Sequence, residues 1–132
     1  MTETKRKLKA YKALCLVGSI LLFVMAIFHG SGFFYVSESI MKSNAEGFLK
    51  EIVPVLFVHP SIHLIGLSAF GILTIFLNND NKKVLVLLSL IVIADALLAF
   101  YLGGTLPGIL LTVAALCFIM ASSKYKQKLN QL

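Results

Sequence analysis

The chain has 132 residues, of which 58% are hydrophobic and only 14% are charged, and its net charge is +6. A soluble domain of this length averages about 45–50% apolar and about 25% charged residues, so the composition excludes an ordinary soluble domain and indicates an integral membrane protein. We interpret residues 1–132 as one transmembrane domain, because the long apolar runs leave no stretch for a separate soluble module.

Ten of the 12 basic residues form three groups that are separated by apolar runs, and the other two, Lys42 and Lys50, lie on the opposite side. Five precede the first run, two lie in a short mid-chain break and three follow the last run: Lys5, Arg6, Lys7, Lys9, Lys12, Lys82, Lys83, Lys124, Lys126 and Lys128. Cytoplasmic segments of membrane proteins are enriched in Lys and Arg, so four spans would place both termini in the cytoplasm. The same grouping argues against nucleic acid as a partner and predicts contact with anionic lipid headgroups at the cytoplasmic face.

The first predicted element is an apolar helix over about residues 10–36. It follows a basic segment, as in a signal peptide, but the hydrophobic stretch 13–28 exceeds the about 7–15 residues of a signal-peptide core. We therefore expect a retained transmembrane helix that loosens or ends at Gly30 and Gly32. The outer connection, residues 37–51, has two interpretations: an interfacial amphipathic helix, or a loop with one helical turn.

Three further apolar helices are predicted over about residues 52–77, 84–102 and 107–122. "NNDNKK" (78–83) and "GGTLPG" (103–108) separate them and are short enough only for tight turns between neighbouring helices. The expected fold is therefore an all-α, antiparallel four-helix membrane bundle. Small residues of the second and third helices should bring helix backbones close together: Gly66, Ala69, Gly71, Ala94, Ala96 and Ala99.

Four ionisable side chains lie inside the predicted spans: His29, His59, His63 and Asp95. Ionisable groups are costly in a bilayer, so each is a functional candidate. With a rise of about 1.5 Å per residue, all four lie roughly 10–16 Å from the outer ends of their helices. They can therefore share one layer in the outer half of the bundle, and Tyr101 at its entrance is a further candidate for ligand binding or proton handling.

A metal centre is one interpretation of this layer. His59 and His63 stand four residues apart, so a helix projects both rings from one face and can offer them to a single metal ion. His29 and Asp95 are weaker candidates to complete a zinc, copper or iron site. Alternatively, His29 and His59, on different helices at one depth, can act as axial ligands of a b-type haem.

Two other interpretations use the same residues. In one, the polar layer is purely structural: Asp95 pairs with a histidine and fixes the helix register of an interaction or assembly protein. In the other, a histidine–aspartate pair handles protons for transport, which four short helices can support only as a homo-oligomer. No serine or cysteine of the spans has a base at a matching depth, so the sequence does not favour an enzyme.

Two stretches carry a family resemblance, "LIGLSAFGILTIF" (64–76) and "ALLAFYLGG" (96–104). Together with the length and the four spans, they resemble the DoxX-like group of small four-helix membrane proteins. The resemblance implies the same topology over most of the chain, and some members of the group are linked to redox partners or to the assembly of other membrane proteins. "HPSIH" (59–63) does not belong to the shared pattern, so no site residue is carried over.

The combined prediction is a small multi-pass protein of a bacterial inner (plasma) membrane with a buried histidine–aspartate site in the outer half of the bundle. The site is expected to bind a ligand, a metal or a partner rather than to catalyse a reaction. The lipid bilayer is the expected environment, and a second copy of the chain or another membrane protein is the expected protein partner.

Overall fold

The computed structural model describes residues 3–77 and 80–129, and all regular secondary structure within them is helical. The five helices are α1 (Glu3–Ser31), α2 (Phe33–Lys42), α3 (Gly47–Leu73), α4 (Asn81–Tyr101) and α5 (Thr105–Leu129). By length and composition, four described segments could cross a membrane: Lys5–Lys42, Gly47–Leu73, Asn81–Tyr101 and Thr105–Lys124. The predicted all-α fold class with four apolar helices is confirmed.

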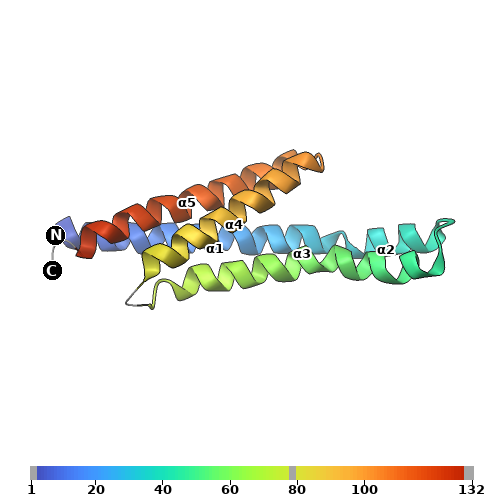
Figure 1. Cartoon of the computed structure of the whole chain (residues 1–132), viewed down its shortest axis with the longest axis horizontal. Helices are drawn as coiled ribbons and strands as arrows, with labels where there is room; N and C mark the ends of the chain where they lie inside the picture. The colour runs from blue at the N-terminus through green and yellow to red at the C-terminus, as the bar shows by residue number, and fades with distance from the viewer. Residues whose placement is uncertain (1–2, 78–79, 130–132) are drawn as a thin grey trace.

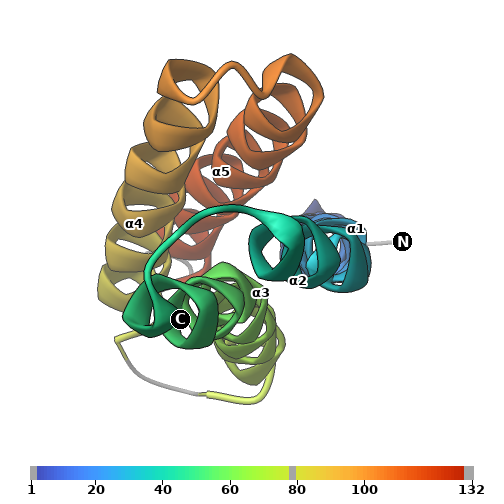
Figure 2. The same ribbon diagram turned by 90° about the vertical axis from the view of Figure 1, so that its right-hand side faces the viewer.

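The molecule is elongated, and its long helices run side by side (Figures 1 and 2). Helix α1 packs against both α3 and α5, and α4 packs along α5, whereas α3 and α4 make few contacts with each other. We call the end at which α1 and α4 begin the proximal end, and the end with linkers 43–46 and 102–104 the distal end (Figure 1). Towards the distal end, α4 and α5 diverge from α1 and α3 (Figure 1). We call the line along which α3 and α4 face each other with few contacts the seam.

Small residues hold α1, α3 and α5 together in the middle of the molecule. A Cβ atom added at Gly18 would lie 2.9 Å from the Phe118 ring, and one added at Gly71 would meet both this ring and Ser19 Oγ. Phe118 is fully buried, so the two glycines provide the space that its ring occupies. The predicted close approach is therefore present at Gly71, whereas Gly66 has no atom within 4 Å of an added Cβ.

The predicted outer connection over 37–51 differs from the structure, because most of it is helical. Helix α2 extends to Lys42 and α3 begins at Gly47, so only residues 43–46 form the linker. The predicted break at Gly30 and Gly32 is confirmed, since α1 ends at Ser31 and α2 begins at Phe33. Gly32 between them has a right-handed backbone, with φ of −75° and ψ of −8°, so α2 continues the line of α1 (Figure 1). An ion pair between Lys42 and Glu38, four residues apart, supports the last turn of α2.

A buried polar network closes the proximal end. The Tyr11 hydroxyl of α1 donates to the Thr74 carbonyl oxygen at 2.7 Å. Asn81 Nδ2, at the start of α4, lies 2.9 Å and 2.8 Å from the carbonyl oxygens of Thr74 and Leu77 and 3.1 Å from the Tyr11 hydroxyl. The network therefore ties the beginning of α4 to the end of α3 and to α1. The turn predicted at 78–83 includes Asn78 and Asn79, which lie outside the described residues.

Candidate functional site

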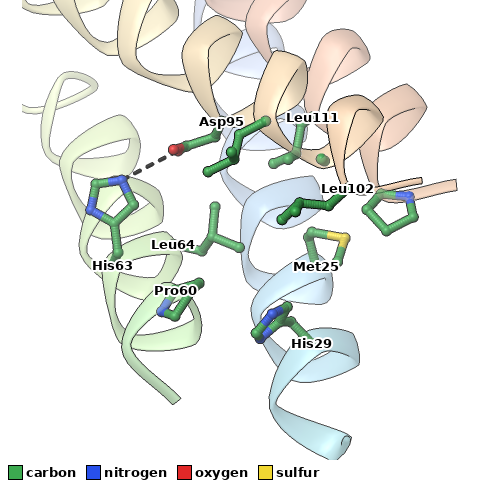
Figure 3. A pocket seen from close by; sticks show the side chains of 11 residues that line it. Met25, His29, Pro60, His63, Leu64, Asp95, Leu102 and Leu111 are labelled. Atoms are coloured by element: carbon green, nitrogen blue, oxygen red, sulfur yellow. Dashed lines mark hydrogen bonds and ion pairs between the residues drawn. The ribbon is translucent and has the colours of Figure 1, made fainter. Parts of the chain in front are cut away.

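The seam between α3 and α4 contains a cleft of about 140 Å³. Four helices line it: α1 and α5 form its floor, and α3 and α4 form its two sides (Figure 3). Its walls are almost entirely apolar, and its ionisable side chains are two histidines and one aspartate. The lining residues are Met25, His29, Pro60, His63, Leu64, Asp95, Leu98, Ala99, Leu102, Pro107 and Leu111.

His63 and Asp95 face each other across the seam (Figure 3). His63 Nε2 of α3 lies 3.2 Å from Asp95 Oδ2 of α4, which is within hydrogen-bond distance. The side chains are 39% and 27% exposed, so the pair sits at the open mouth of the cleft. The sequence predicts a buried site, but no charged side chain among the described residues is buried. The seam explains the difference, because α3 and α4 diverge at this level and leave the pair uncovered.

His29 occupies the floor of the cleft on α1 and is held by two groups of α3. Its Nδ1 lies 3.2 Å from the hydroxyl of Ser61, which is buried. Its ring stacks on Phe57 with ring centroids 4.5 Å apart and planes inclined by 21°. Ser61 and Phe57 are four residues apart and therefore share the face of α3 that meets α1. Leu64 and Pro60 separate His29 from His63, so the two imidazoles do not face each other (Figure 3).

Two predicted site residues, His59 and Tyr101, do not line the cleft. His59 is exposed and lies one turn distal to His63, outside the part of α3 that lines the cleft with α4 and α5. Tyr101 is 86% exposed at the end of α4, and its neighbours Leu98 and Leu102 occupy the cleft-facing side of that helix. Depth in the bundle was estimated from the sequence, but helix rotation and the divergence of the helices decide which side chains meet.

The donor groups do not form the predicted metal centre. No three His, Cys, Asp or Glu residues within the described ranges lie close enough together to hold a metal ion. His59 is outside the cleft, and His29 is separated from the His63–Asp95 pair. A b-type haem also does not fit, because a cavity of about 150 Å³ holds one benzene ring and a porphyrin is several times larger. The described residues therefore give the metal and haem interpretations no supporting arrangement, and both stay predictions.

Phe57 does not line the cleft, but it stacks on His29, and the sequence interpretation missed this contact. Its signal was its position four residues before Ser61, which places both on one helical face next to the layer that contains His29. The apolar lining from α5, Pro107 and Leu111, was also missed, since nothing in the sequence shows that α5 forms part of the cleft floor.

No protein-family model, curated protein or solved structure matches the chain. The DoxX-like resemblance therefore stays a prediction that rests on the length, the four spans and the stretches 64–76 and 96–104. Four residues of the cleft lie within these stretches: Leu64, Leu98, Ala99 and Leu102.

Proposed function

We propose that the protein is a membrane-embedded binding protein for a small, largely apolar ligand. In this proposal the four helices form an antiparallel bundle in a bacterial inner membrane, with the proximal end and both termini in the cytoplasm. The basic residues at the proximal end support this orientation. The distal half then faces the outer leaflet, and the seam between α3 and α4 opens sideways to lipid.

The proposal rests on the His63–Asp95 pair at the mouth of the apolar cleft, because the two side chains make fewer hydrogen bonds than they can form. Polar groups that only join helices in a membrane normally satisfy their hydrogen-bonding capacity within the protein. Here, Asp95 Oδ1 and His63 Nδ1 have no hydrogen-bond partner in the part of the chain that the structure describes. Ligand sites combine apolar walls with a few such convergent polar groups, because the walls give affinity and the polar groups give orientation.

The size of the cleft limits the ligand. Pockets for drug-sized molecules measure about 300–1,000 Å³, whereas this cleft measures about 140 Å³. An apolar cavity of about 150 Å³ accommodates one benzene ring. The cleft therefore accommodates a ring-sized group or the end of an alkyl chain, and any remaining part of the ligand would lie in the surrounding lipid.

A second candidate is an interaction or assembly protein in which the pair is a structural latch. The observation in its favour is that His63 and Asp95 bridge the seam at which α3 and α4 otherwise make few contacts. The two candidates differ in what the cleft does: a latch needs no occupant, whereas a binding site responds to one.

Methionine methyl resonances provide the test, because Met25 lines the cleft. Protein labelled with ¹³C-methyl methionine in lipid nanodiscs would be titrated with benzyl alcohol. The Met25 methyl signal should shift and saturate. The methyl groups of Met41 and Met120, which are exposed and lie outside the cleft, report general partitioning into lipid.

A matched pair of variants shows whether the cleft causes the response. Ala99→Leu places a larger side chain in the cleft and should abolish the Met25 shift, whereas Ala94→Leu changes an exposed position of the same helix and should retain it. An identical shift in both variants, or a wild-type protein that does not respond, would overturn the binding proposal and favour the latch.

A further inference from the structure

One carboxylate, that of Asp95, lies in the middle of an apolar segment and away from the other charged residues along the chain. The other acidic residues lie at or beyond the ends of the spans: Glu3, Glu38, Glu46, Glu51 and Asp80. No Lys or Arg occurs between residues 84 and 123, so the two helices that contain or adjoin Asp95 have no fixed positive charge at its level. A carboxylate in hydrocarbon is costly unless a cation or several donors accompany it.

The surroundings of Asp95 provide only one polar partner. Helix α3 contributes His63, which is its only hydrogen-bond partner in the described ranges, and α1 contributes His29 to the far side of the cleft. Helix α5 contributes Pro107 and Leu111, neither of which can titrate or donate. A carboxylate can accept about four hydrogen bonds, so most of the capacity of Asp95 is unused.

From this arrangement we infer that the ligand is a ring-sized organic cation whose positive charge lies beside Asp95 and whose apolar part occupies the cleft. The inference rests on the proposed binding function and specifies its ligand class. An apolar molecule with one positive charge satisfies both features of the site, since its apolar part matches the walls and its charge supplies what Asp95 lacks. An anion would meet the carboxylate at the mouth and be repelled.

His63 is the group with which a cationic ligand would compete for Asp95, because its Nε2 lies 3.2 Å from Asp95 Oδ2. His29 also faces the cleft, but Leu64 and Pro60 separate it from the pair (Figure 3). The ligand's positive charge would therefore meet the carboxylate on the side that His63 leaves open.

Two isosteric probes test the assignment. Benzyltrimethylammonium carries the positive charge, and neopentylbenzene has the same shape without it. Each is titrated into nanodiscs that contain the wild-type protein, the Met25 methyl signal is followed, and affinity is expressed per mole fraction of probe in the lipid. We expect the cation to bind at least about tenfold more tightly than the neutral probe.

Three variants assign the preference to residues. Asp95→Asn should remove the advantage of the cation while binding of neopentylbenzene persists. His63→Gln should retain cation binding, because the carboxylate of Asp95 remains. Asp80→Asn is the matched control, because it removes an exposed carboxylate at the proximal end and should change neither probe.

The outcomes separate this inference from the proposed function. Equal affinities of the two probes, or a cation preference that survives Asp95→Asn, would overturn the assignment of a cation and leave the cleft as a binding site for neutral molecules. A Met25 signal that responds to neither probe would overturn both. The wild-type comparison between the two probes requires no variant, so poor folding of Asp95→Asn does not obscure the result.

Discussion

The proximal end and the distal cleft both contain polar side chains on apolar helices, but these side chains differ in exposure and in the number of their hydrogen-bond partners. At the proximal end, Tyr11 is 4% exposed and Asn81 is 1% exposed, and the Asn81 amide nitrogen has three acceptors within hydrogen-bond distance. In the cleft, the side chains of His63 and Asp95 are 39% and 27% exposed and share a single contact.

Under the proposed function, this difference separates the polar groups that hold the fold together from those that would meet a ligand. The buried network lies where three helix segments meet and where leaving a donor or acceptor unpaired is expensive. Its one exception is Asn81 Oδ1, which is buried and accepts no hydrogen bond within the described residues. The cleft pair lies where two helices diverge, so the packing around it is incomplete.

The largest predicted effect is at Asn81, because its side chain serves two carbonyl oxygens and one hydroxyl. Asn81→Leu should lower the free energy of unfolding by about 3 kcal/mol, since the carbonyl oxygens of Thr74 and Leu77 would lose a buried donor. Unfolding by SDS in mixed micelles measures this change. Tyr11→Phe, which removes only a hydroxyl, should cost about 1 kcal/mol. A neutral Asn81→Leu would contradict the view that the proximal end is held by this network.

The next effect concerns the close packing beside the network. Gly71→Ala should destabilise the protein by about 2 kcal/mol, because the new Cβ atom meets Ser19 Oγ and lies 2.9 Å from the Phe118 ring. Gly66→Ala, on the same helix, is the matched control and should be neutral or slightly stabilising, because an added Cβ has no neighbour within 4 Å. Equal losses in the two variants would show that the close contacts at Gly71 are not the cause of its effect, because Gly66 has no such contacts. The same SDS titration measures both.

A smaller effect is expected at the cleft pair. A double-mutant cycle with His63→Ala and Asp95→Asn should give a coupling of about 0.6 kcal/mol in the free energy of unfolding, since a half-exposed contact contributes little. A coupling above about 2 kcal/mol would support the structural latch instead of the binding site.

The smallest effect is expected at His59. His59→Ala should change stability by less than about 0.5 kcal/mol and leave the Met25 response to benzyl alcohol unaltered, because His59 is exposed and does not line the cleft. A clear loss of binding in this variant would show that the site extends further towards the distal end than the cleft does.

The sequence allowed the helices to be predicted more completely than the site. Uninterrupted apolar runs determine the four long helices, and the helix rise was sufficient to place His63 and Asp95 near one level. The continuation of α1 into α2 could not be predicted, because glycine is compatible with both a helical and a broken backbone and neighbouring contacts decide at Gly32. The position of His59 could not be predicted either, since its depth does not show whether another helix lies opposite.

Under the proposed function, the cleft opens sideways to lipid, and this opening decides whether the ligand concentration in the bilayer or that in water governs binding. A ligand that enters through the seam between α3 and α4 arrives from the bilayer, so the occupancy of the cleft follows its mole fraction among the lipids and not its concentration in water. Two ligands with equal contacts to His63 and Asp95 would then differ in apparent potency by the ratio of their partition coefficients. Adding lipid at constant total ligand would dilute the ligand and empty the site without any change in the protein.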